Sequence, residues 1–135
     1  MNHKKLSVFV IDVKNKNKNT GKKIIKDDLE VFYKIIGCKC IDTRQINGKY
    51  FDFIIDDEGA LADTPILSAI ASNNGIQFYG TVIVCGLADD DGDLTSLTDE
   101  DFDILKNHLK YRLEIGNYLN TGKVELLPIL CDVNY

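Results

Sequence analysis

The chain has 135 residues, of which 44% are hydrophobic and 27% charged, and its formal net charge is −5. These values are typical of one globular domain that closes its own core, and they argue against a dedicated nucleic-acid binder, which usually carries a basic excess. Charge is unevenly distributed, because residues 1–34 hold nine lysines and four acids, whereas residues 86–104 hold eight acids and no lysine or arginine. We therefore expect a single domain, residues 1–135, whose charge asymmetry acts on the choice of partner.

The first apolar segment, LSVFVIDV, begins at Leu6 and predicts a strand over about 6–13 that is apolar on both faces. It does not resemble an export signal, because Asp12 interrupts it and further lysines follow. No run approaches the roughly twenty apolar residues that span a bilayer. We expect a cytoplasmic protein without a membrane segment.

Local signals then predict the first half of the fold. A Lys/Asn-rich loop covers residues 14–23, and Lys23 to Ile25 fit a short strand. Acids at the start and Gly37 at the end delimit a helix over about 27–36. Strands at about 38–46 and 50–57 are joined by Asn47-Gly48, a strong hairpin signal, and Asp57-Glu58-Gly59 predicts a turn.

In the second half, Pro65 followed by ILSAIAS predicts a short helix, and residues 73–75 a turn. TVIVCG, residues 81–86, is a β-branched core strand, a helix is expected over about 99–115, and VELLPIL fits an edge strand that tolerates Pro128. The expected fold class is α+β: a single mixed, mainly antiparallel sheet with two main helices packed on one face. The apolar stripes expected to be buried are Leu29, Phe32 and Ile36 on the first helix and Phe102, Leu105 and Leu109 on the second.

Four cysteines stand at positions 38, 40, 85 and 131. Reduced, mostly buried thiols are the simplest interpretation, since a free cysteine behaves as a small hydrophobic residue. A zinc site or a structural disulfide is the alternative, although the zinc-knuckle spacing is absent.

The acidic stretch admits three interpretations: a metal loop, a surface for a basic partner, or the start of a helix. An EF-hand with Gly92 at its sixth position would have Leu87 first and Thr98 twelfth, and neither is a suitable ligand. Thr98 and Asp101 instead predict a helix cap. The acids left over form a predicted turn around Gly92, which is either a solvated loop or a contact for a basic partner or an adventitious cation. The candidate partner-binding residues are Asp89, Asp90, Asp91 and Asp93. We expect no metal and no cofactor.

No catalytic signature is visible. Cys85 and His108 lack any supporting nucleophile motif, and NTGKK, residues 19–23, lacks the residues of a P-loop. Exposed carboxylates in a solvated loop keep ordinary acidity and are poorly suited to acid–base chemistry. The protein is therefore not expected to be an enzyme.

Two long segments, GCKCIDTRQINGKYFDFIIDDEGALADTP and YGTVIVCGLADDDGDLTSLTDEDF, resemble DUF3846, a family of small uncharacterised proteins of bacteriophages, prophages and conjugative elements. The resemblance covers about residues 22–110, and the Lys/Asn-rich loop and the C-terminal tail lie outside it. It implies a mobile-element setting in a bacterial host and no particular chemistry.

The leading functional hypothesis is a non-catalytic accessory protein that counters host defence by sequestering a small nucleotide-type signal. Aromatic rings and Arg can stack on a base, and Asn or Gln can bond to its edge. The candidate ligand-binding residues are Arg44, Asn73, Asn74, Gln77, Phe78 and Tyr79. A homodimer is expected to complete such a site, because clefts between subunits supply concavity.

The alternative hypothesis is a protein-interaction module whose acidic face binds a basic host protein. The modest net charge argues against close mimicry of nucleic acid, because the Lys-rich end offsets the acids.

Overall fold

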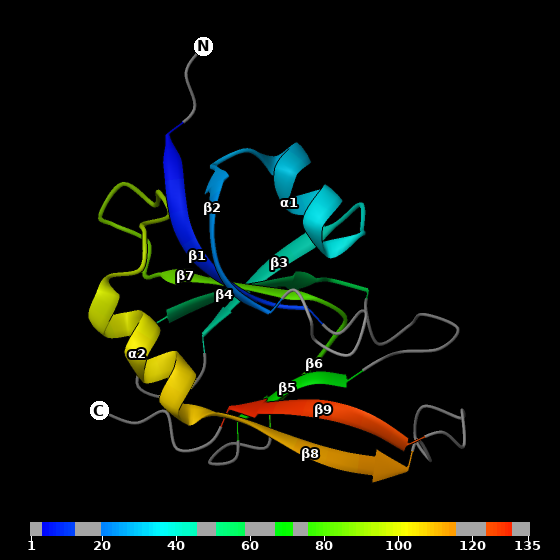
Figure 1. The fold of residues 1–135 in the computed structure, drawn as a ribbon. Helices are drawn as coiled ribbons and strands as arrows, with labels where there is room; N and C mark the ends of the chain where they lie inside the picture. Colours follow the sequence, from blue (N-terminus) through cyan, green and yellow to red (C-terminus); the bar gives the residue numbers. More distant parts are fainter. Residues whose placement is uncertain are drawn as a thin grey trace.

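The computed structural model describes residues 4–12, 20–45, 51–58, 67–71, 76–115 and 124–130. Its main layer is a five-stranded sheet with the strand order β2-β1-β7-β4-β3, in which every neighbouring pair is antiparallel (Figure 1). The strands are β1 (Lys5–Ile11), β2 (Gly21–Lys26), β3 (Ile41–Gln45), β4 (Phe51–Asp56) and β7 (Val82–Gly86). The three inner strands are buried along almost their whole length, as strands covered on both faces must be.

One face of this sheet is covered by α1 (Leu29–Ile36). Phe32 and Ile36 of the helix pack on every second residue of the inner strands, among them Val8 and Ile83. Asp28 caps the helix by accepting a hydrogen bond from the Glu30 amide, and the left-handed Gly37, with φ of 80°, ends it.

The opposite face is covered by α2 (Asp99–His108) and by a second sheet. Phe102 and Leu105 of α2 pack on the alternate residues of the inner strands, such as Phe9 and Val84. The predicted cap is confirmed, since Thr98 accepts from the Asp101 amide and the Asp101 carboxylate accepts from the Thr98 amide.

The second sheet has the order β6-β5-β9-β8 and lies beneath the first in Figure 1. Its strands are β5 (Leu67–Ala71), β6 (Ile76–Tyr79), β8 (Leu109–Ile115) and β9 (Val124–Leu130). β5 and β9 run parallel and the other neighbours antiparallel. The ring of Phe78 on β6 stacks on that of Phe53 on β4, with centroids 5.6 Å apart, which joins the two sheets.

The α+β class and the mainly antiparallel sheet are confirmed, but the predicted layout is wrong in two respects. The strands form two sheets instead of one, and the two helices lie on opposite faces of the first sheet. The physical reason is that β1 and β7 are apolar on both sides, so each side needs its own cover.

Three element predictions are also corrected. Residues 67–71 form a strand instead of a helix, and the helix expected over 99–115 ends at His108, where β8 begins. β9 lies between β5 and β8 and is not an edge strand. The backbone in these segments follows strand pairing, of β5 with β6 and β9 and of β8 with β9, which overrides local helical preference.

Of the six stripe residues expected to be buried, five are buried and Leu29 is not, with 54% of its surface exposed. Leu29 is the first residue of α1, directly after the cap. The hairpin turn at 47–48, Gly59, the turn at 73–75 and most of the Lys/Asn-rich loop lie outside the described residues. No helix within the described part of the chain is long and apolar enough to cross a membrane.

Candidate functional site

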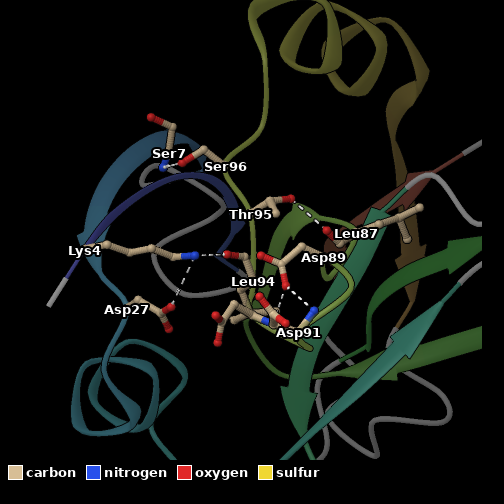
Figure 2. Close-up of polar contacts among 10 residues, drawn as sticks. Lys4, Ser7, Asp27, Leu87, Asp89, Asp91, Leu94, Thr95 and Ser96 are labelled. Atoms are coloured by element: carbon tan, nitrogen blue, oxygen red, sulfur yellow. Dashed lines mark hydrogen bonds and ion pairs between the residues drawn. The ribbon is translucent and has the colours of Figure 1, made fainter.

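The acidic segment joins β7 to α2 and is held against the first sheet by backbone contacts. The Leu97 amide donates to the Ser7 carbonyl at 2.9 Å, and the Ser7 amide donates to Ser96 Oγ at 3.0 Å. The Gly86 amide donates to the Thr95 carbonyl at 2.9 Å, which forms an isolated β-bridge. Figure 2 shows the contact between Ser7 and Ser96. The two ends of the segment are therefore fixed to β1 and β7.

A buried carboxylate secures the beginning of the segment. Asp52 on β4 is only 3% exposed, and its Oδ2 accepts a hydrogen bond from the Ala88 amide at 2.9 Å. Thr95 Oγ1 donates to the Leu87 carbonyl at 2.8 Å, so the two halves of the loop are tied together (Figure 2). Sequence reasoning did not identify Asp52 as part of this site. The available signal was an acid within the otherwise apolar strand FDFIID, because a buried charge needs hydrogen-bond partners.

The tip of the loop is a tight turn organised by Asp89. Its Oδ1 accepts from the amides of Asp91 and Asp93, both at 3.0 Å, and Gly92 adopts a left-handed φ of 84°. The four predicted partner-binding residues, Asp89, Asp90, Asp91 and Asp93, are all exposed. The structure thus presents all four together at one turn, as the sequence predicted.

Carboxylate oxygens of Asp89, Asp91 and Asp93 lie within 4.8 Å of one another, an arrangement that could meet a cation. All three are exposed, and one oxygen of Asp89 already accepts two backbone hydrogen bonds. The positions that would end an EF-hand loop are occupied by Leu87 and Thr98.

Calcium at millimolar concentration is expected to leave the melting temperature nearly unchanged. A cation that bound only the folded state would raise the melting temperature by mass action. Thermal unfolding with calcium, and with magnesium as a control for ionic strength, measures this directly. A rise specific to calcium that disappears in Asp91→Ala would contradict the prediction.

Part of the acidic charge is neutralised by the lysines near the N-terminus. Lys22 Nζ lies 3.9 Å from Asp99 Oδ1 and 4.8 Å from the centre of the Phe102 ring. Lys4 Nζ donates to the Leu94 carbonyl and lies 4.0 Å from Asp27 (Figure 2). Among the described residues, no lysine or arginine forms an ion pair with Asp90, Asp91 or Asp93. Within the described part of the chain, ion pairs therefore do not offset the charge of these three aspartates.

The predicted ligand-binding residues are only partly brought together. Phe78 is 3% exposed and stacked in the core, so its predicted role as a stacking surface for a ligand is wrong. Gln77 and Tyr79 flank it on β6, whereas Asn73 and Asn74 lie outside the described residues. Arg44 is exposed on the edge strand β3, where its Nε donates to Asp42 Oδ2 at 2.8 Å.

Pairing within the sheet places Arg44 on the side of β6. Arg44 is the cross-strand partner of Phe53, and paired residues share a face of an antiparallel sheet. Phe53 is also the residue whose ring stacks on Phe78. Arg44 thus lies on the face that carries the second sheet.

The cysteines in the described residues are free thiols. Cys85 is buried, but Cys38 is half-buried and Cys40 is exposed, and both precede β3 instead of lying on a strand. The expectation of mostly buried thiols is therefore wrong for Cys38 and Cys40, and Cys131 lies outside the described residues. Cys85 packs on the face that α1 covers, whereas His108 belongs to α2 on the opposite face. The fold does not bring these two residues together.

Cys85 makes folding stability sensitive to alkaline pH. Burial raises the pKa of its thiol from 9.0 to about 12, and the charges of Asp52 and Asp27 act in the same direction. Above pH 9 the unfolded chain loses this proton while the folded protein keeps it, so alkali favours unfolding. Between pH 9 and 12 the Cys85 contribution is expected to lower the free energy of unfolding by about 1 kcal/mol per pH unit.

Urea unfolding at about pH 8 and about pH 10.5 measures this loss of stability. Other groups titrate in the same range, and Cys85→Ala serves as the control that retains them. The variant should lose less stability than the unchanged protein over the same pH interval. Equal losses in the two proteins would contradict the assignment to Cys85.

The fold and the site define a small α+β domain with an acidic turn fixed to its central sheet. The family model described as "Domain of unknown function (DUF3846)" matches residues 6–110, which is most of the chain. The chain belongs to this family, and the resemblance noted in the sequence is confirmed. The match begins at residue 6 instead of about residue 22, so the expectation that the Lys/Asn-rich loop lies outside it is wrong. No curated protein and no solved structure shows significant similarity to it.

Proposed function

We propose that the protein is a non-catalytic binding protein whose acidic turn, Asp89 to Asp93, binds a basic partner protein. The observation that carries the proposal is that this turn is both exposed and fixed. Hydrogen bonds from Asp91 and Asp93 amides to Asp89 define its shape, and the contact of Ala88 with buried Asp52 holds its base. A prearranged charged surface loses little conformational freedom when a partner binds, which favours affinity.

The charge distribution supports a basic partner. Lys22 and Lys4 interact with other parts of the segment and leave Asp90, Asp91 and Asp93 without an ion pair in the described residues. Complementary charge raises the rate of encounter and the specificity more than the final affinity. In the mobile-element setting that the family resemblance implies, the partner would be a host protein.

The test compares two double variants, each of which neutralises two adjacent and exposed turn residues. Asp90→Asn with Asp91→Asn removes charge from the proposed surface, and Asp57→Asn with Glu58→Gln removes equal charge after β4. The tagged proteins are used to capture partners from host lysate, and carbodiimide then links carboxylates to partner lysines. We expect salt-sensitive capture with cross-links at 89–93, and about threefold to thirtyfold weaker binding only in the first variant. Equal capture by both variants, or cross-links elsewhere, would refute the proposal.

The second candidate function is sequestration of a small nucleotide-type signal, with counter-defence as its purpose. It is favoured by the position of Arg44 on the same sheet face as Phe53, whose ring stacks on Phe78. Phe78 belongs to β6, the strand that also carries Gln77 and Tyr79. In this proposal Arg44 binds a phosphate and Tyr79 replaces Phe78 as the stacking ring. A homodimer would complete the concavity.

A thermal-shift screen with cyclic dinucleotides and ADP-ribose derivatives tests this second function. Binding should weaken by about tenfold to a hundredfold in Tyr79→Ala, and also weaken in Arg44→Gln, while both variants remain folded. Phe78→Ala cannot serve in this test, because it would disturb the core. The absence of any shift across the panel would remove this candidate.

A further inference from the structure

A hollow of about 540 Å³ lies at the C-terminal end of α1, away from the acidic turn and from Arg44. Its size falls within the range of small-molecule sites. The residues that line it are Glu30, Tyr33, Lys34, Gly37, Cys38 and Lys39. They come from α1, with Glu30 in its first turn and Lys34 in its last, and from the chain that leads to β3 (Figure 1).

The shape of the hollow follows from the end of the helix. Gly37 has a left-handed φ of 80°, which turns the chain sharply after Ile36. The amides of Gly37 and Cys38 both donate to the Tyr33 carbonyl, at 2.7 and 3.0 Å. This carbonyl is therefore already satisfied, and residues on both sides of the turn, Tyr33 and Lys34 before it and Cys38 and Lys39 after it, line the hollow.

The lining combines a ring with two cations. Tyr33 is half-buried and lines the hollow. Lys34 and Lys39 are exposed, and neither forms an ion pair with any described residue. Glu30 is exposed on the rim one helical turn before Lys34 and can accept hydrogen bonds from amino or hydroxyl groups.

We propose that this hollow binds a nucleoside monophosphate, with the base against Tyr33 and the phosphate between Lys34 and Lys39. A base of any identity can stack on an aromatic ring, and two ammonium groups suit a phosphate that carries close to two negative charges. The proposal concerns a different place from the two proposed functions, and it holds or fails independently of them.

Cysteine footprinting gives a direct test with an internal control. Cys38 lines the hollow, whereas Cys40 lies two residues further on and does not. Trypsin cleaves after Lys34, Lys39 and Arg44, so the two thiols are recovered on separate peptides, IIGCK and CIDTR. The folded protein is alkylated at mildly alkaline pH, because burial raises the pKa of Cys38, with and without millimolar AMP. AMP should slow alkylation of Cys38 and leave that of Cys40 unchanged.

Variants then identify the groups that bind, with affinity for AMP measured by titration calorimetry. Tyr33→Leu should weaken binding by about tenfold or more, whereas Tyr33→Phe, which keeps the ring, should bind nearly as the unchanged protein does. Lys34→Gln with Lys39→Gln should weaken it by about twofold to twentyfold, and Lys23→Gln with Lys26→Gln, an equal change of charge on β2, should not.

Adenosine and inorganic phosphate, tested separately, should each bind more weakly than AMP. The proposal is overturned if AMP protects neither cysteine, protects both equally, or binds the Tyr33→Leu protein with unchanged affinity. Phosphate binding as tightly as AMP would also overturn it, because the ring would then contribute nothing. Protection of Cys38 locates the bound AMP in this hollow, which separates the site from the second proposed function.

Discussion

Phe53→Ala is expected to lower the free energy of unfolding by about 3–5 kcal/mol, the largest loss we predict for a single substitution. Phe53 is 1% exposed, its ring stacks on Phe78 at 5.6 Å and contacts Phe51 edge-to-face at 6.5 Å. Truncation would leave a cavity where the two sheets meet and remove both ring contacts. Chemical denaturation followed by circular dichroism measures the effect, and because a domain of this size is marginally stable, the variant could be largely unfolded at 37 °C.

The matched control is Leu29→Ala. Both residues are large and apolar, but Leu29 is 54% exposed at the start of α1. Its truncation should change the free energy of unfolding by no more than about 0.5 kcal/mol. A similar loss in both variants would mean that the second sheet does not pack on Phe53 as the structure shows.

The features predicted correctly from sequence are those set by local chemistry. Asp28 and Gly37 delimit α1, and Thr98 with Asp101 caps α2, because each cap satisfies backbone groups within a few residues of itself. The strands around the Asn47-Gly48 signal pair antiparallel as expected, from Ile41 opposite Asp56 onward. Such features require no knowledge of distant parts of the chain.

The second sheet could not be predicted in this way. Leu105, Leu109 and Leu113 have helical spacing. Within LKYRLEI, residues 109–115, apolar and charged side chains also alternate, as they do in a strand. The choice depends on pairing with residues 124–130, which follow the strand in the sequence and cannot be recognised as its partner from local pattern. The placement of the helices was open to prediction, because a strand apolar on both faces requires cover on both.

In the candidate site, too, local features could be predicted and contacts between distant residues could not. The acidic turn is local, so its four aspartates could be named in advance, whereas its anchor Asp52 lies on a different strand, 36 residues before Ala88. Phe78 and Tyr79 are adjacent on β6, and because neighbouring residues of a strand face opposite ways, the sequence predicts that one of them is buried without indicating which. Contact with Phe53 decides that it is Phe78.

Gly86→Ala is expected to destabilise the protein by about 1–3 kcal/mol and to loosen the acidic segment. A Cβ at this position would lie 2.3 Å from Thr95 Oγ1, 3.0 Å from the Ser96 carbonyl oxygen and 3.2 Å from the Thr95 carbonyl oxygen. Two of these neighbours are backbone atoms, which cannot rotate away as a side chain can. The segment would have to move off β7, and the hydrogen bond between the Gly86 amide and the Thr95 carbonyl would be lost.

Hydrogen exchange distinguishes this local effect from general destabilisation. In Gly86→Ala the amides of Gly86 and Leu97, which donate to Thr95 and Ser7, should exchange faster, while the amides of α1 change only as far as global stability does. In a double-mutant cycle, Thr95→Ala removes the nearest of the three atoms, so Gly86→Ala should cost less in that background. The destabilisation that Gly86→Ala still causes in that background measures the clash with the two carbonyl oxygens. The contrary result would be an unchanged melting temperature in Gly86→Ala together with unchanged exchange of both amides. It would mean that the segment is not held against β7 and that the acidic surface lacks the fixed shape on which the proposed function depends.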